Sequence, residues 1–276
     1  MPVSLKEIPV DSWSDFEARV RQLIDDPGIY PRLFRGLGNG CWGLETTLER
    51  SYPNERCDET LSLLKYYRKA LAAKPALETF SGRRWDRLPD LEAFGKNLKE
   101  HRSAWLDDKL RDQNEIYEYL VYLRHQGFPS PLLDWTASPY VAAFFAFDTV
   151  PENVDRVCVY ALGRGGGGSY DQHCYILGPY MRTHQRHFLQ QSWYSMCVRS
   201  DPDGEDYVFR RQEPAFRDDL GPAERLLKLT IPSKERQTVL QHLVLMYINP
   251  FSLFGSEDSL VRTVARRECY FKNWHL

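Results

Sequence analysis

Hydrophobic and polar positions predict a helix, a short strand and a second helix between residues 112 and 147. In the first helix, apolar residues recur at helical spacing, and Asp112 with Glu115 three positions later matches a capping box. Gly127 followed by Pro129 is a signal that ends a helix. We therefore expect the chain to turn here and to enter the strand.

The strand and the second helix are predicted by different signals. Residues 131–136 form a short apolar run that ends in polar side chains, and Ser138 with Pro139 supplies the preferred N-cap and first residue of a helix. Residues 141–147 are apolar on every side, so we expect this helix to be buried. Polar groups at the ends of buried elements are common at binding sites. Four such residues gather here: His125, Asp134, Thr136 and Ser138.

The remaining elements are interspersed without a regular β-α-β spacing, which favours an α+β fold. Helical patterns occupy residues 10–26, 233–247 and a last stretch after Ser256, with Ser233 and Ser256 as expected caps. Strand patterns occupy residues 30–36, 155–162, 193–198 and 226–231. Residues 55–106 are rich in charge and helix formers and look like a helical insert. We expect a single domain over residues 1–276 that carries this insert.

Composition excludes some classes of protein. The chain has 276 residues, a formal net charge of −2 and no run of about 18 apolar residues, so nothing predicts a membrane span or a global attraction to nucleic acid. Six cysteines without a C-x-x-C pair favour reduced thiols in the cytoplasm. The glycines at 165–168 lack the continuation of a P-loop, and the spacing of His173, Cys174, His184 and His187 fits no standard zinc site, so we predict no metal.

Three stretches carry motifs. The first is Leu33-Phe34-Arg35-Gly36 with Trp42, Leu44, Leu48 and Arg50. The second is the run that carries His125, Gly127, Pro129, Leu132, Leu133, Asp134, Trp135, Thr136, Ser138 and Pro139. The third is Arg186 with Gln190-Gln191 and Tyr194. Together they resemble the FRG domain, named for its Phe-Arg-Gly motif, over about residues 12–265.

The FRG domain in turn resembles the ADP-ribosyltransferase fold, in which two small β-sheets pack across a cleft that holds NAD. Its arginine-serine-glutamate class has Arg-Gly on a first strand, a Ser-Thr-Ser-like strand leading into an apolar helix, and a catalytic glutamate. Arg35-Gly36 matches the first element and residues 136–138 match the second. The third falls at Gln190-Gln191, where glutamine replaces glutamate. The resemblance thus implies an α+β fold of split β-sheets around a cleft, with a helical insert.

The resemblance also implies roles for the site residues. NAD would bind as the substrate to Arg35, Gly36, Thr136 and Ser138. A guanidinium binds a pyrophosphate through charge-assisted hydrogen bonds, and a hydroxyl at a helix N-terminus lies where anions are favoured. Gln191 would take the catalytic position, but an amide carries no charge and cannot act as a base. His125 or Asp134 would then supply the missing chemistry. Glu205 and Glu213 are the next candidates for a carboxylate.

Structural readings stay open for the same residues. Ser138 is explained as a helix cap, Asp134 as a buried turn former and His125 as a histidine at a helix end. Most arginines are solvated, so Arg35 alone predicts a surface ion pair as readily as an anion clamp.

Three functions are therefore compatible with the sequence. The first is an NAD-dependent ADP-ribosyltransferase, or an NAD-cleaving protein, that acts on a macromolecular acceptor such as a protein or nucleic acid, in a bacterial toxin or phage-defence setting. The second is a non-catalytic module that binds a nucleotide or nucleic acid, which the glutamine favours. The third is a pure interaction domain that uses the helical insert. The first rests on family analogy.

Overall fold

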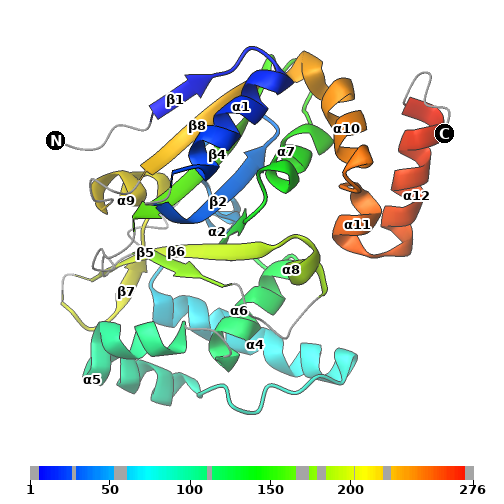
Figure 1. Ribbon diagram of the computed structural model, residues 1–276. Helices are drawn as coiled ribbons and strands as arrows, with labels where there is room; N and C mark the ends of the chain where they lie inside the picture. Colours follow the sequence, from blue (N-terminus) through cyan, green and yellow to red (C-terminus); the bar gives the residue numbers. More distant parts are fainter. Residues whose placement is uncertain are drawn as a thin grey trace.

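The computed structural model describes residues 6–26, 29–52, 61–110, 114–165, 174–178, 185–201, 203–219 and 225–270, and within them eight strands form a mixed sheet (Figure 1). The strands are β1 (Lys6–Pro9), β2 (Ile29–Leu37), β3 (Leu133–Thr136), β4 (Arg156–Gly165), β5 (Cys174–Leu177), β6 (Ser192–Ser200), β7 (Tyr207–Phe209) and β8 (Arg225–Pro232). Their order is β1-β8-β4-β2-β3-β6-β5, with β7 paired to β6. The pair β1–β8 is parallel and the other pairs are antiparallel.

The sheet nearly separates between β2 and β3. β2 pairs with β4 in register from residue 32 to residue 37, whereas the described residues of β2 and β3 share the single pair Phe34–Thr136. The two strands therefore diverge directly beyond that pair. The expected α+β class is confirmed, but the two predicted sheets are joined by this one pair into a single sheet.

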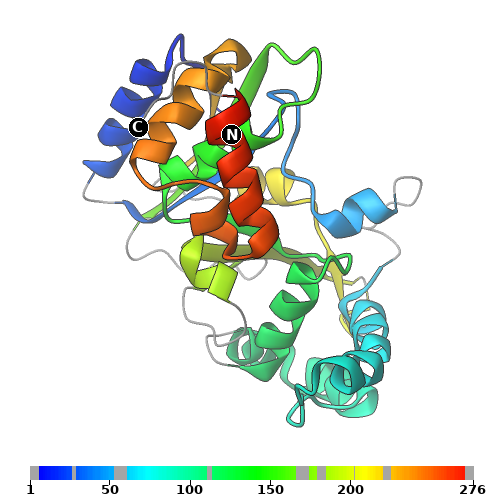
Figure 2. The ribbon, with the colours of Figure 1, turned by 90° about the vertical axis from the view of Figure 1, so that its right-hand side faces the viewer.

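Helices cover the two parts of the sheet from different sides. They are α1 (Trp13–Ile24), α2 (Thr47–Ser51), α4 (Leu63–Ser81), α5 (Leu91–Lys109), α6 (Glu115–His125), α7 (Pro139–Asp148), α8 (Gln185–Leu189), α9 (Gln212–Asp219), α10 (Arg236–Leu245), α11 (Pro250–Phe254) and α12 (Glu257–Ala265). α1, α7 and α10 pack on the part that contains β2, β4 and β8, while α4, α5 and α6 lie against the part that contains β6 and β7 (Figures 1 and 2). α4 and α5 form the region expected to be a helical insert.

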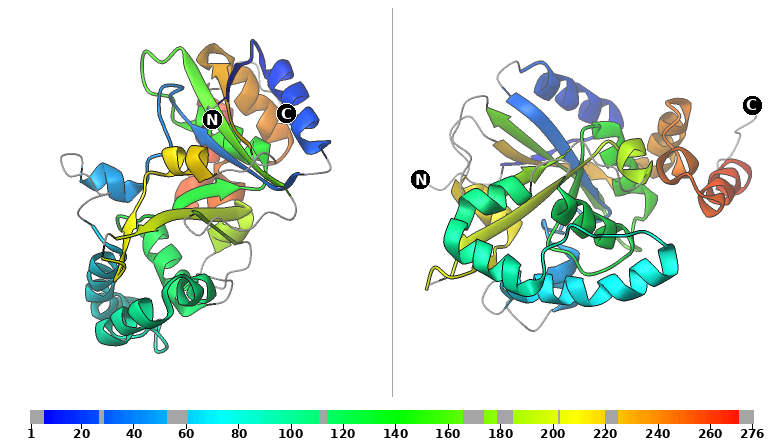
Figure 3. Two further views of the ribbon diagram at one scale, coloured as in Figure 1. Left: turned by 90° about the vertical axis from the view of Figure 1, so that its left-hand side faces the viewer. Right: turned by 90° about the horizontal axis from the view of Figure 1, so that it is seen from below.

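Three apolar clusters hold these layers together. One lies between α1, α7 and α10 and the strands β4 and β8, and a second lies between α4–α6 and the strands β6 and β7. Figure 3 shows the ribbon of these helices and strands from two further sides. The third lies on the face of the sheet that α9 covers, where Leu33, Trp135 and Tyr160 pack with Phe216 of α9. This third cluster contains residues of both β2 and β3, so it packs across the junction of these two strands. None of the described helices is both long enough and apolar enough to cross a membrane.

α7 forms as its local sequence predicts. The Ser138 hydroxyl accepts a hydrogen bond from the backbone N–H of Val141 at 3.2 Å, and Pro139 occupies the first turn. The helix is buried almost throughout, which fits its apolar sequence. α7 therefore presents its backbone directly to β2.

Gly36 permits this close contact between α7 and β2. A Cβ atom at position 36 would lie 1.8 Å from the carbonyl oxygen of Ala142, a backbone atom of α7. Phe34 projects to the same side of β2 and packs among the side chains of α7, whereas Arg35 projects to the opposite side, as strand alternation requires. The glycine of the Phe-Arg-Gly motif is thus explained by packing.

The far end of α7 is held by charged side chains. The Asp148 carboxylate accepts a 2.8 Å hydrogen bond from Arg262 and a further one from Arg266, both of the C-terminal region. The Arg236 guanidinium donates to the carbonyl oxygens of Phe147 at 2.8 Å and Asp148 at 3.1 Å. These contacts satisfy carbonyls at the end of the helix and tie α10 and α12 to it.

Two expected caps differ from those observed. α6 is capped by Asn114, which accepts from the N–H of Ile116 at 3.0 Å, because an asparagine directly before the first helical turn competes with the more distant Asp112. Asp112 itself lies outside the described residues, as do glycines 166–168. The Ser233 hydroxyl donates to the carbonyl of Val154 and caps no helix; a short 3₁₀ turn precedes α10. The helix α11 was not predicted.

Gly36→Ala is expected to destabilise the protein by roughly 1–3 kcal/mol or more, because its methyl group overlaps a helix carbonyl that cannot move alone. Gly95→Ala is the matched control: its Cβ would meet only Leu64 side-chain atoms at 3.5 Å, and alanine favours a helix by up to about 1 kcal/mol. Urea unfolding of both variants checks this. Equal stability of the two variants would show that the β2–α7 contact is loose.

Candidate functional site

A cavity of about 620 Å³ lies where β2 and β3 diverge. Its wall comes from both strands, from the loop after β2, from the end of α6 and from α7, α8 and α11. Five residues predicted from sequence line it: Arg35, Gly36, His125, Asp134 and Thr136. Ser138 and Gln191 are not among the lining residues.

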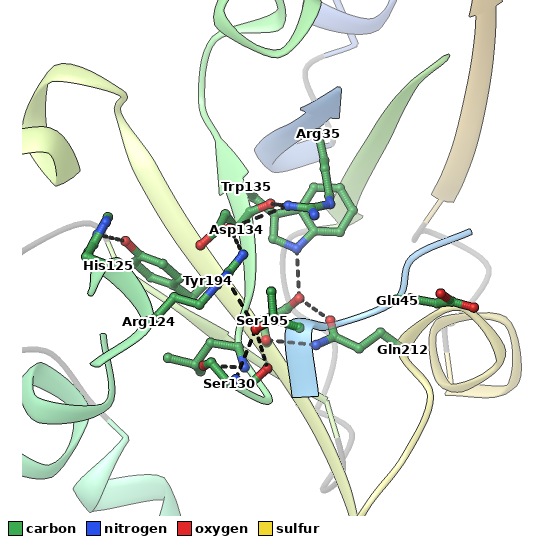
Figure 4. Close-up of polar contacts among 12 residues, drawn as sticks. Arg35, Glu45, Arg124, His125, Ser130, Asp134, Trp135, Tyr194, Ser195 and Gln212 are labelled. Atoms are coloured by element: carbon green, nitrogen blue, oxygen red, sulfur yellow. Dashed lines mark hydrogen bonds and ion pairs between the residues drawn. The ribbon is translucent and has the colours of Figure 1, made fainter. Parts of the chain in front are cut away.

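Asp134 of β3 joins two arginines at the centre of the wall (Figure 4). Arg124 of α6 donates a short hydrogen bond to the Asp134 carboxylate. Arg35 of β2 lies 3.7 Å from the same carboxylate oxygen and donates at 2.7 Å to the Asp134 backbone carbonyl. The Arg35 guanidinium therefore bridges the gap that opens between β2 and β3.

Burial and charge act against each other in this group. Burial lowers the pKa of Arg35 to about 10, although the Asp134 carboxylate opposes that shift, so Arg35 remains a cation at neutral pH. Burial by itself would raise the pKa of Asp134, but Arg124, Arg35 and His125 together hold it below its usual value. Asp134 therefore stays ionised and keeps both guanidiniums in place.

The cavity is electropositive although the whole chain is slightly acidic. Among the described residues, four arginines line it (Arg35, Arg50, Arg124 and Arg186), against two carboxylates (Glu45 and Asp134). The lining thus carries an excess of two positive charges, while the formal charge of the chain is −2. Concentrating cations in a concave, partly buried surface favours an anionic ligand.

Two donors in this wall lack a protein acceptor. Within the described part of the chain, the Nε atoms of Arg35 and Arg124 are buried and have no hydrogen-bond partner. An unpaired buried donor costs free energy, and that cost is higher for a charged group. Ligand or water oxygens that reach these atoms would remove this cost.

A second layer of hydrogen bonds holds the strand and the arginine. Arg124 donates to the Thr47 hydroxyl at 3.3 Å, and the same hydroxyl accepts from the N–H of Ser130 at 3.0 Å. Behind β3, the Trp135 indole donates to Ser195 at 2.7 Å, and Ser195 donates to Gln212 (Figure 4). These buried bonds fix β3 before any ligand arrives, as a pre-organised site requires.

His125 is held by a tyrosine behind the wall. Its Nε2 atom lies 2.8 Å from the hydroxyl of Tyr194, a fully buried residue of β6. Burial raises the pKa of Tyr194, so its hydroxyl keeps its proton at neutral pH. The sequence motif thus brings His125 and Asp134 to one wall, and Tyr194 fixes the ring.

The glutamine pair is divided by a turn in the backbone. Gln191 has a positive φ of 49° and an exposed side chain, whereas Gln190 lines the cavity and donates to the carbonyl of Leu253 at 3.1 Å. The Thr136 hydroxyl donates to the Gln190 carbonyl at 2.7 Å. Of the two glutamines, the structure therefore places Gln190, and not Gln191, beside the predicted binding residues.

The other predicted carboxylates lie elsewhere. Glu205 pairs with Lys99 at 2.7 Å on the surface, and Glu213 accepts from the Tyr160 hydroxyl at 3.1 Å. Neither lines the cavity.

In the described residues no group of three His, Cys, Asp or Glu side chains could hold a metal ion. Glu45, exposed at the cavity, was not predicted.

Sequence reasoning also missed Arg124, although it directly precedes His125. Its helical position gave no signal, because only the fold brings α6 beside β3. Trp42 and Arg186 belong to the recognised motifs but had no assigned place; the structure puts both in the cavity wall. Trp42 is 47% exposed there, and the Arg186 guanidinium lies over the ring of Phe254.

Comparison with known families supports the resemblance. Residues 31–154 match the model of the FRG domain, a span that runs from β2 through α7 and contains Arg35, Arg124 and Asp134. The chain therefore contains an FRG domain at residues 31–154. Comparisons with curated proteins and with solved structures gave no match.

Asp134→Asn is expected to destabilise the protein at neutral pH, because it leaves Arg35 and Arg124 without their shared counter-charge. A carboxyl whose pKa is lowered by folding contributes stability above its ordinary value of 3.8 and loses that contribution as the pH falls further. The stability difference from wild type should therefore shrink below about pH 4. Urea unfolding of wild type and variant, at neutral pH and below about pH 4, measures this stability difference.

Asp86→Asn is the control for this experiment, because Asp86 forms an exposed pair with Arg84 and should contribute little. A stability difference for Asp134→Asn that stays constant with pH would contradict the assignment.

Ser138→Ala is expected to lower stability by about 1 kcal/mol through loss of the α7 cap, while Ser138→Asp keeps the cap. Since Ser138 is not part of the cavity wall, neither change should alter affinity for a ligand bound there. Thermal unfolding and calorimetric titration of NAD with both variants check the two statements. Weaker NAD binding by a folded Ser138→Ala variant would place the hydroxyl in the binding site.

Proposed function

We propose that this cavity binds NAD through its diphosphate and that the protein transfers ADP-ribose from NAD to a macromolecular acceptor. The observation that carries the proposal is the pair of guanidiniums, Arg35 and Arg124, that Asp134 holds in the wall of an electropositive cavity. Arginines bind phosphate oxygens through charge-assisted hydrogen bonds, and these two keep buried Nε donors.

The shape and lining of the cavity support a nucleotide. A volume of about 620 Å³ lies within the range of small-molecule and cofactor sites. Aromatic side chains of Trp42, Phe145 and Phe254 contribute to its wall and offer surfaces on which a flat ring can stack. The combination of cations with aromatic rings is suited to a dinucleotide.

Cleavage of NAD adds a further requirement, because a cationic sugar develops as nicotinamide leaves. Asp134 and Glu45 are the two carboxylates of the cavity wall. Asp134 shares its charge with two arginines, which reduces its effect on a cation. In this proposal Glu45 or the amide of Gln190 assists the sugar, and His125 exchanges the proton. Such an activity on a macromolecule would suit a toxin or antiviral-defence protein that uses cytoplasmic NAD.

A second candidate function is binding of a nucleotide without cleavage. It is favoured by the pairing of Asp134 with both arginines and by the exposed position of the Gln191 side chain. Release of nicotinamide by the purified protein distinguishes the two functions, since only the transferase or hydrolase produces it.

Arg35→Ala is expected to weaken NAD binding by roughly ten-fold to a hundred-fold, the loss typical of hydrogen bonds to a charged group. Arg35→Lys should also bind poorly, because one ammonium cannot replace the planar guanidinium. Arg84→Ala removes an arginine that is 70% exposed and outside the cavity, so it controls for the change in net charge. Isothermal titration calorimetry of the variants with NAD provides the measurement. Equal affinity of the folded Arg35→Ala and Arg84→Ala variants would rule out Arg35 as the anion clamp.

A further inference from the structure

The hydroxyl of Tyr194 lies between two imidazoles. Its oxygen is 2.8 Å from Nε2 of His125 and 3.4 Å from Nδ1 of His187. His187 belongs to α8, is buried, and stacks on the Tyr194 ring with an interplanar angle of 16°. His125 ends α6 and lines the cavity, and Figure 4 shows its ring beside the Tyr194 hydroxyl. The buried group therefore connects to the candidate site through the ring of His125.

A single phenol proton cannot serve both histidines. Tyr194 donates one hydrogen bond and accepts others, and a neutral imidazole has one donor and one acceptor nitrogen. If Tyr194 donates to His187, the 2.8 Å contact between the Tyr194 oxygen and Nε2 of His125 requires His125 to carry its proton on Nε2. If Tyr194 donates to His125 instead, the neutral His125 carries its proton on Nδ1. The choice between these arrangements decides which His125 nitrogen can take up a proton.

We propose that Tyr194 donates to Nδ1 of His187 and accepts from Nε2–H of His125, so that Tyr194 and His187 are positioning residues that make Nδ1 the proton-accepting atom of His125. In this arrangement the neutral and charged forms of His125 both donate from Nε2 to Tyr194. His125 can then gain or lose a proton without any rearrangement of the buried network. His187 gives the tyrosine proton an acceptor other than His125. The Ser192 side chain also interacts with Tyr194, and its hydroxyl can donate to the tyrosine oxygen without taking that proton.

The charged groups around His125 do not settle the tautomer by themselves. The Asp134 carboxylate favours a charged imidazole, and Arg124 beside it on α6 opposes that charge. Arg35 and Arg186 line the same cavity and add to the opposition. The hydrogen bonds of Tyr194 therefore decide where the proton sits, and the surrounding charges modify how readily it is taken up.

The consequence for catalysis rests on the proposed function. When an acceptor hydroxyl attacks C1′ of the ribose, the C1′–N bond breaks and nicotinamide leaves as a neutral molecule with the bonding electron pair. The acceptor oxygen forms the new bond to C1′, and its proton passes to Nδ1 of His125. That proton then leaves to solvent and restores the neutral imidazole. General-base assistance of this kind requires an unprotonated Nδ1.

The tautomer can be measured without any ligand. In nitrogen-15 NMR spectra of the imidazoles, assigned with His125→Gln, we expect neutral wild-type His125 to carry its proton on Nε2. His187→Phe keeps a ring in the stacked position but removes the acceptor nitrogen. Tyr194 should then donate its proton to Nε2 of His125, and neutral His125 should carry its own proton on Nδ1. A wild-type His125 protonated on Nδ1, or a tautomer unchanged by His187→Phe, would overturn the proposal.

The kinetic test uses Tyr194→Phe, which removes one oxygen and keeps the buried ring. Nicotinamide release should slow on the order of ten-fold, and the acidic limb of its pH profile should move to lower pH because charged His125 loses the oxygen that accepts its Nε2–H. Tyr119→Phe is the matched control: it also removes a buried hydroxyl, one that donates to the Ala70 carbonyl at 2.7 Å in the α4–α6 layer. Its pH profile should match wild type.

The two proposals fail in different ways. Absence of nicotinamide release from wild type at every pH would end the proposal of NAD cleavage, and the NMR experiment would still decide the tautomer. An active wild type whose pH profile is unchanged in Tyr194→Phe would instead reject the positioning role while leaving the transferase proposal intact.

Discussion

The carboxylate of Asp134, shared between Arg124 and Arg35, is the interaction on which this structure depends. It lies where β2 and β3 part after one residue pair, so strand pairing alone cannot hold the two parts of the sheet at a fixed distance. The two guanidiniums, from α6 and β2, provide that connection together with the apolar cluster that contains Leu33 of β2 and Trp135 of β3. The same arginines that join the two parts also line the electropositive cavity.

The surroundings of this ion group are rigid on both sides. Gly36 lets α7 lie directly against β2, and the Trp135–Ser195–Gln212 hydrogen bonds fix β3 from behind. Separate apolar clusters pack the helices onto each part of the sheet. A cavity between two firmly packed layers keeps its shape without a ligand, which lowers the cost of binding one. The structure thus accounts for a binding site whose cations are already in place.

Local signals in the sequence predicted much of this arrangement. β3, α7 and the Ser138 cap were predicted because periodicity, proline and a hydroxyl N-cap act within a few residues. Arg124 was missed because its partner Asp134 is reached only through the fold. The glutamine pair shows a related limit: the positive φ of Gln191 reverses which side chain meets the cavity, and nothing in the residue types reports that turn. The role of Gly36 in packing likewise depends on α7, which is distant in the chain.

The most direct test of the account is a crystal structure of the protein with ADP-ribose, which carries the diphosphate of NAD and cannot lose nicotinamide. We expect the diphosphate between β2 and β3, with its oxygens within hydrogen-bond distance of Arg35 and Arg124, including their buried Nε atoms. The Asp134 carboxylate should keep its contacts with both guanidiniums. Ligand density outside this cavity, or a diphosphate that contacts neither arginine, would contradict it.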